Sequence, residues 1–239
     1  MGLSSRQYFE AGQVRAAQEV LAAQLRTSPD DARARSFLFN LLCFSGDWER
    51  ARKQLAILAG TEEGTRMGSL LYLSALNAET QREQIIRERA FPATPVSAKL
   101  SGRLNGKQFS EIHDADPDLG ARLEIFVAGS CLWIPFEWIE SVRVQAPTQL
   151  TDILWAQGFV TVRKSPERDS DIGEALLPAM YPFSFRHSDE NVWLGRRTAW
   201  GRDEHGTEFP IGQRMLMADG EEIPFLEVRT IEFDPLPET

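Results

Sequence analysis

The chain has 239 residues, enough for one large domain or two small ones, and 42% of its side chains are hydrophobic. Asp and Glu outnumber Lys and Arg by 35 to 26, so the formal net charge is -9, the opposite sign from most proteins that grip nucleic acid. Its apolar runs are far shorter than the roughly 20 residues of a bilayer-spanning helix, and its N-terminus lacks signal-peptide character. The composition therefore predicts a cytoplasmic protein without nucleic-acid or membrane partners.

Two N-terminal stretches, residues 5–25 and 32–58, carry apolar side chains at helical spacing, and each is interrupted by a glycine. The interruptions at Gly12 and Gly46 lie one tetratricopeptide period of 34 residues apart. The residues that align at this offset are Gly12 with Gly46, Val14 with Trp48, Ala17 with Ala51, and Leu21 with Leu55. Because glycine permits a tight turn and alanine lets helices approach closely, we predict two stacked helical hairpins.

A third helical stretch spans about residues 65–90 and lacks the glycine turn, so we expect it to form the capping helices of an open repeat stack. Two prolines follow, Pro92 and Pro95, which disfavour helix. Composition also changes here, since residues 96–239 carry 24 acidic and 14 basic side chains, a net charge of -10. We therefore predict an all-α domain over 1–91, a linker over 92–99 and a second domain over 100–239.

From about residue 100 the apolar period shortens, which indicates strands. Asn105-Gly106 favours a type I′ hairpin turn, and residues 123–128 and 131–135 form a second hairpin pattern. The clearest hairpin signal joins residues 214–217 to a strand over 223–231, and residues 163–173 read as a loop. We predict an α+β protein whose C-terminal domain is a small β-rich barrel or sandwich.

The block Trp133-Ile134-Pro135-Phe136-Glu137-Trp138-Ile139 is the most aromatic part of this β-rich half. Large apolar side chains in a short strand are usually buried. We therefore predict that Trp133, Pro135, Phe136 and Trp138 lie mainly in its core, with an exposed binding patch as the alternative.

Three short patterns resemble sites of chemistry, and none of them completes a catalytic set. Residues 102–107 resemble a phosphate-binding loop, but their spacing is wrong by one residue, which favours a hairpin turn. Asp114 and Asp116 are weak candidates for a Ca²⁺ or Mg²⁺ site, with a solvated turn as the alternative. His113 and Cys131 could act as a base and a thiol nucleophile only if the fold brought them together. We expect a protein without cofactors.

Several of these motifs coincide with one known family. Residues 41–51 (LLCFSGDWERA) resemble the repeat signature of the ImpE/TagJ family, accessory proteins of bacterial type VI secretion systems. The β-rich half is similar to that family in Gly106, Phe109, Asp114-Ala115-Asp116, Leu119-Gly120, Leu123-Glu124, Gly129, Trp133-Ile134-Pro135-Phe136, 150–155 (LTDILW), Tyr181-Pro182 and 212–216 (GQRML). The resemblance covers nearly the whole chain, although the helical part is shorter than in many members and Cys131-Leu132 replaces an aromatic pair.

The resemblance implies a tetratricopeptide-like domain joined to a β-rich domain. It also implies a non-enzymatic cytoplasmic adaptor that binds the small sheath protein TssB and, in some members, is thereby linked to the ATPase ClpV, which dismantles contracted sheath. Two other interpretations stay open from the residues alone. One is a hydrolase or metal-dependent enzyme that uses Asp114, Asp116 and His113, and the other is a general peptide-binding repeat protein.

Repeat stacks bind partners along the first helix of each hairpin, which here runs from about residue 32 to 44. The positions expected to lock the paired helices together, and so to be interior, are Leu38, Leu42, Ala51 and Leu55. Arg33, Ser36 and Asn40 then form one helical stripe facing the groove, and Arg6 extends it one repeat earlier. These four residues are our candidate partner-binding site, with plain solvation as the alternative for each.

Overall fold

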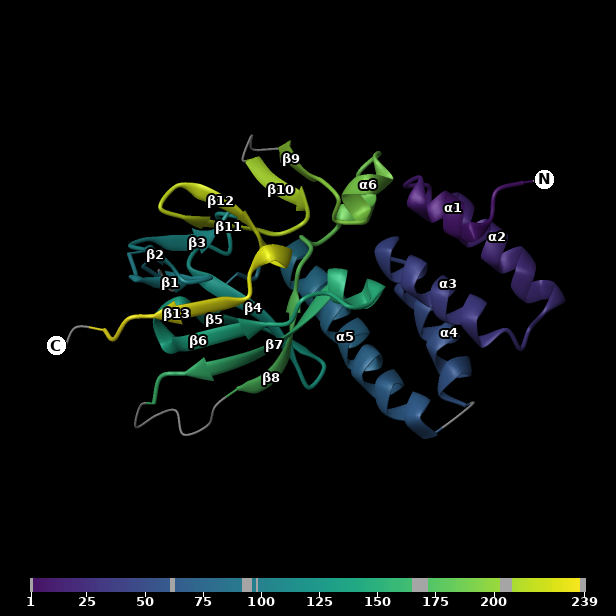
Figure 1. Cartoon of the computed structure of the whole chain (residues 1–239), viewed down its shortest axis with the longest axis horizontal. Coiled ribbons are helices and arrows are strands. Elements are labelled where there is room, and N and C mark those ends of the chain that lie inside the picture. The colour runs from purple at the N-terminus through teal and green to yellow at the C-terminus, as the bar shows by residue number, and fades with distance from the viewer. Residues whose placement is uncertain are drawn as a thin grey trace.

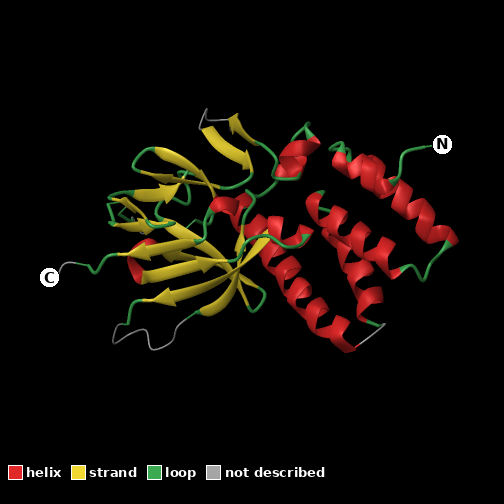
Figure 2. Ribbon diagram, in the orientation of Figure 1, coloured by secondary structure: helices red, strands yellow, loops and turns green. Residues whose placement is uncertain are grey.

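The computed structural model has helices in the N-terminal part of the chain and strands in the C-terminal part, as Figures 1 and 2 show. The described residues are 2–60, 63–91, 96–97, 99–164, 172–202 and 208–236. The predicted α+β class is confirmed. Within these ranges, no helix combines the length and the apolar character needed to cross a bilayer.

Two helical hairpins open the fold, as the 34-residue period predicts. They are α1 (Ser5–Glu10) with α2 (Val14–Thr27), and α3 (Ala32–Phe44) with α4 (Trp48–Ala59). Gly12 and Gly46 make the two turns with φ of 75° and 68°, a conformation that glycine adopts without a steric penalty. Ala17 and Ala51 are fully buried where the helices of each pair approach. The side chains of Asp31 and Asp47 accept hydrogen bonds at the starts of α3 and α4.

The turn at Gly46 is also held by a residue from the far end of the chain. A Cβ atom added there would lie 2.4 Å from the ring of Phe185. Gly46→Ala should therefore lower the free energy of unfolding by roughly 1–2 kcal/mol for the left-handed backbone alone, with the clash adding to it. Urea denaturation measures this change. The matched control is Gly68→Ala, where nothing lies within 4 Å, and equal stability of both variants would contradict the argument.

The third helical stretch is a single 25-residue helix, α5 (Glu63–Arg87), and the expectation of capping helices at an open end is wrong. Leu76 of α5 belongs to one hydrophobic core with Leu42 of α3 and with Phe126 and Trp155 of the large sheet. The helix is therefore covered by α4 on one side and by strands on the other, as Figure 1 shows. Residues 92–95 lie outside the described residues, so the linker over 92–99 stays a prediction.

Among the described residues, the strands form three antiparallel sheets. In the described part of the chain the large sheet has eight strands, in the spatial order β2 (Lys107–Phe109), β1 (Gly102–Leu104), β13 (Thr230–Phe233), β6 (Ile139–Val144), β7 (Trp155–Val162), β8 (Gly173–Pro178), β4 (Arg122–Val127), β5 (Ser130–Pro135). The smaller sheets are β12 (Glu221–Pro224), β11 (Met215–Ala218) and β3 (Ile112–Asp114), and the pair β10 (Glu208–Gly212) and β9 (Thr198–Arg202). A second core with Ile125, Val142, Leu216 and Ile231 joins the first two sheets.

Where this half is described, it also contains a short helix, α6 (Glu190–Trp193), and four 3-10 turns. These turns span Phe136–Trp138, Leu150–Ile153, Ser184–Arg186 and Phe225–Glu227. The last turn breaks the strand predicted over 223–231, because β12 ends at Pro224 and β13 joins the large sheet. The loop predicted over 163–173 lies largely outside the described residues, since 165–171 are not described.

The predicted hairpin at Asn105-Gly106 is confirmed, because both residues have positive φ between β1 and β2. The predicted strand pair on either side of Gly129 is confirmed in the same way as β4 and β5. The residues of the aromatic block differ in how far they are buried. Phe136 is fully buried as predicted, Trp133 is half-buried, and the prediction for Trp138 is wrong because this side chain is 40% exposed. A 3-10 turn at this point rotates Trp138 away from the face that Phe136 occupies.

Candidate functional site

The predicted stripe on α3 lies at a groove that both halves of the protein build. This helical groove, of about 190 Å³, is lined by Ser36, Phe39, Asn40, Leu55, Leu58, Gly68, Ser69, Tyr72, Gln149 and Thr151. The four positions predicted to be interior, Leu38, Leu42, Ala51 and Leu55, are all buried. Of the four candidate residues, the structure brings Ser36 and Asn40 together at the groove.

The other two candidates are exposed and do not belong to this lining. Arg33 lies on α3 one turn before Ser36. Arg6 lies on α1, with its side chain 83% exposed and 3.2 Å from the carboxylate of Glu10. The stripe therefore continues along α3 outside the groove, and Arg6 does not extend the groove itself.

Sequence reasoning missed the wall opposite α3. The hydroxyl of Tyr72 on α5 accepts a hydrogen bond from Nε2 of Gln149 at 2.8 Å and lies 2.9 Å from the hydroxyl of Thr151. Tyr72 is thereby fixed against a turn of the β-rich half, and burial raises the pKa of its hydroxyl. No periodic pattern signals this contact, because the paired residues lie more than 70 positions apart in the chain.

A buried set of charges holds α5 to the sheet. This junction cluster consists of Glu79 and Arg82 on α5, Asp114 on β3, Glu124 on β4, Tyr181 and Arg214. Nε of Arg82 donates to Oε1 of Glu124 at 3.0 Å, and its Nη2 lies 2.6 Å from Oε2 of the same carboxylate. Arg214 also pairs with Glu124, and Nε1 of Trp133 donates to Glu124 at 2.7 Å. Glu124 is thus the centre of the cluster.

The electrostatics of the cluster follow from burial and pairing. Burial alone would raise the pKa of Glu124, but the charges of Arg82 and Arg214 outweigh it and lower that pKa to about 2. Burial raises the pKa of Glu79 despite the nearby charge of Arg82. Glu124 is therefore the carboxylate at which pairing outweighs burial, and each arginine has it as a partner.

The two residues proposed from sequence as metal ligands lie at the edge of this cluster. Oδ1 of Asp114 accepts a hydrogen bond from the hydroxyl of Tyr181 at 2.8 Å, and its Oδ2 lies 3.5 Å from Nε of Arg214. Burial, followed by the charge of Asp114, raises the pKa of Asp116 to about 6. Among the described residues, no group of three His, Cys, Asp or Glu side chains could hold a metal ion. Asp114 serves instead as the partner of Arg214.

His113 and Cys131, which the sequence analysis considered as a base and a thiol nucleophile, have different hydrogen-bond partners. Nδ1 of His113 contacts the backbone oxygen of Asp114 at 2.8 Å. The thiol of Cys131 donates to Glu124 at 3.5 Å, and burial raises its pKa. A thiol with a raised pKa is a weak nucleophile, because the thiolate is the reactive form. Neither contact joins His113 to Cys131.

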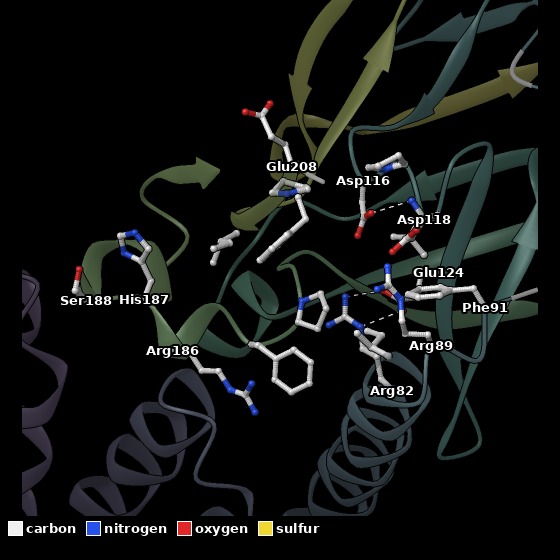
Figure 3. A pocket seen from close by; sticks show the side chains of 18 residues that line it. Arg82, Arg89, Phe91, Asp116, Asp118, Glu124, Arg186, His187, Ser188 and Glu208 are labelled. Atoms are coloured by element: carbon white, nitrogen blue, oxygen red, sulfur yellow. Dashed lines mark hydrogen bonds and ion pairs between the residues drawn. The ribbon is translucent and has the colours of Figure 1, made fainter. Parts of the chain in front are cut away.

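A larger cavity opens beside the junction cluster, as Figure 3 shows. This junction pocket has a volume of about 520 Å³ and lies between the end of α5, the turn at residues 116–119, the loop at residues 182–188 and β10. Arg82 and Glu124 form its floor. Its apolar walls include Ile86, Leu119, Phe209 and Ile211. No sequence pattern indicates this pocket, because its walls come from four separate segments.

Comparison with known proteins covers both halves of the chain. The family model described as ImpE protein matches residues 106–232, and one described as tetratricopeptide repeat matches residues 8–71. The chain is 27% identical to the type VI secretion system accessory component TagJ of Pseudomonas aeruginosa, over 98% of this chain and 92% of that protein.

The X-ray crystal structure of protein VPA1032 from Vibrio parahaemolyticus superposes with a TM-score of 0.81 at 20% identity. It covers 97% of this chain and 98% of that one, so the whole two-part fold is shared. The helical repeats match a widespread repeat type, whereas the ImpE match spans more than half of the chain and includes the junction cluster residues Asp114, Glu124 and Arg214. The chain therefore belongs to the ImpE protein family.

Proposed function

We propose that this protein is a non-enzymatic adaptor of a bacterial type VI secretion system that acts in the cytoplasm. Its partner is the small sheath protein TssB, of which it binds a helix, and through TssB it is linked to sheath recycling by ClpV. The proposal is supported by family membership and by similarity, along nearly the whole chain, to a protein named as an accessory component of that system.

The observation that carries the binding mode is the position of Ser36 and Asn40 at the helical groove. These two residues lie one helical turn apart on α3, so they present polar groups along one face. Phe39, Leu55 and Leu58 line the same groove with apolar side chains that are 3–9% exposed. This combination suits an amphipathic helix. Its apolar side chains would contact the apolar lining of the groove, and its polar side chains would form hydrogen bonds with the polar groups.

The test is a pull-down with the full chain as bait and, as prey, the TssB protein of a type VI secretion system from the same bacterium. We expect Arg33→Glu/Asn40→Ala to weaken binding by about tenfold or more, which corresponds to about 1.4 kcal/mol. Lys53→Glu is the matched control, since it reverses an exposed charge on α4 outside the groove lining and should bind like the wild type.

Thermal melting of all three proteins should coincide, because the substituted side chains are exposed or half-buried. Wild-type binding by the double variant would exclude the groove as the contact. If the wild type did not bind TssB but bound unrelated amphipathic helices, the protein would instead be a general peptide-binding repeat protein. The link to ClpV predicts that ClpV is captured only when TssB is present.

A further inference from the structure

We propose that the junction pocket is a second binding site, which takes an apolar side chain from a basic segment of a protein partner. The site is distinct from the helical groove. Gly68 lines the groove and Ile86 lines the pocket, and both lie on α5. Their separation of 18 residues corresponds to about 27 Å along a helix. The inference therefore does not depend on the proposed function.

The size and walls of the pocket suit an apolar group. Its volume of about 520 Å³ lies within the range of ligand sites. Apolar surface comes from three different segments, which carry Ile86 and Phe91, Leu119, and Phe209 and Ile211. Phe209 remains 37% exposed, so part of this surface meets solvent. Filling the pocket with an apolar side chain would remove that surface from water.

The floor of the pocket offers nothing to a charged group. The guanidinium of Arg82 is engaged by Glu124, by Glu79 and by the backbone oxygen of Met180 at 2.9 Å. Glu124 accepts from both arginines of the junction cluster and from Trp133. A charged ligand atom placed on this floor would lose water without gaining a free partner. The part of the occupant that enters the pocket must therefore be apolar.

The carboxylates at the rim of the pocket, on Asp116, Asp118 and Glu208, favour a positive charge next to the apolar group of the ligand. Asp116 and Asp118 lie side by side above the floor, joined by a hydrogen bond of 3.0 Å from the backbone nitrogen of Asp118 to Asp116 (Figure 3). Glu208 stands on the same upper side of the pocket and is paired with Arg202. Asp118 is exposed, so an approaching cation can reach its carboxylate.

Cationic residues of the lining do not cancel this pattern. The guanidinium of Arg186 lies 4.2 Å from the ring centre of Phe183 and points away from the two aspartates in Figure 3. Arg89 also lines the pocket, so the lining outside the floor carries three carboxylates, on Asp116, Asp118 and Glu208, against the two guanidinium groups of Arg89 and Arg186. The surrounding half of the chain, residues 96–239, has a net charge of -10, which adds a long-range attraction for basic segments.

Three blocked tripeptides serve as probes for the full-length protein, with binding measured by saturation-transfer NMR. They are acetyl-Lys-Phe-Lys-amide, acetyl-Lys-Gly-Lys-amide and acetyl-Glu-Phe-Glu-amide. We expect the first to bind about tenfold more tightly than either of the others, because it alone supplies both the apolar group and the positive charge. Equal binding of the Lys-Phe-Lys and Glu-Phe-Glu peptides would overturn the charge argument, and equal binding of the glycine peptide would overturn the pocket.

Substitutions in and outside the junction pocket test whether the Lys-Phe-Lys peptide binds there. Asp118→Lys should weaken binding of the Lys-Phe-Lys peptide about tenfold, whereas Glu140→Lys, an exposed position on β6 with the same change of charge, should leave it unchanged. Ile86→Trp should fill the cavity and weaken binding of the same peptide. Wild-type affinity in both Asp118→Lys and Ile86→Trp would refute the site. Because Asp118 is exposed, its variant keeps the test decisive if the tryptophan variant fails to fold.

Discussion

Arg82→Met is expected to lower the free energy of unfolding by about 3–5 kcal/mol, the cost of breaking a buried ion pair by removing one partner. Arg82 is only 1% exposed and makes two contacts with Glu124. Methionine fills a similar space but leaves the carboxylate of Glu124 with one arginine instead of two. The substitution also removes the bond from α5 to the backbone oxygen of Met180.

Urea denaturation at neutral pH measures the effect, with Arg6→Met as the control. The side chain of Arg6 is 83% exposed, so its replacement should change stability by no more than about 0.5 kcal/mol. Adding Glu124→Gln to Arg82→Met removes the stranded charge and should recover part of the loss. A double variant less stable than Arg82→Met would show that packing, and not charge pairing, dominates at this position.

The same variant has a pH signature. Since pairing lowers the pKa of Glu124 from 4.5 to about 2, the resulting stabilisation is complete above pH 4.5 and is lost as the pH falls towards 2. The difference in stability between the wild type and Arg82→Met should therefore be largest near neutral pH and shrink in acid. A difference that stayed constant from pH 7 to pH 3 would exclude the ion pair as its cause.

Phe136→Ala is expected to destabilise the protein by roughly 3–5 kcal/mol, as is usual when a buried aromatic ring is removed. Phe136 is fully buried in the core of the β-rich half, and its ring centre lies 5.5 Å from that of Phe233 on β13. Alanine would leave a cavity where the 3-10 turn after β5 meets the large sheet. Differential scanning calorimetry should show a lower melting temperature.

Leu132→Ala on β5 is the control for this cavity. Leu132 is 44% exposed, so its truncation should cost no more than about 1 kcal/mol. A Phe136→Ala protein with unchanged melting but with lost partner binding would instead identify the aromatic block as a binding patch.

Local patterns determined much of this fold. The 34-residue offset between Gly12 and Gly46 located both helical hairpins, because glycine adopts the positive φ of a tight turn without a steric penalty. The pair Asn105-Gly106 located a β-hairpin, because both residues of its turn have positive φ, which asparagine and glycine adopt most readily. Burial of Leu38, Leu42, Ala51 and Leu55 followed from helical periodicity alone.

Only the tertiary structure decided what lies between the two halves. The apolar pattern of α5 does not reveal whether solvent or a sheet covers the helix, so the sequence suggested a cap where the fold places a shared core. Arg82, Glu124 and Arg214 come from three distant segments and read as ordinary surface charges, yet they meet buried. Tyr72 and Gln149 join one wall of the helical groove in the same way. Periodicity reports neighbours along a helix or strand, whereas these contacts depend on how whole elements pack, and that information is not local in the chain.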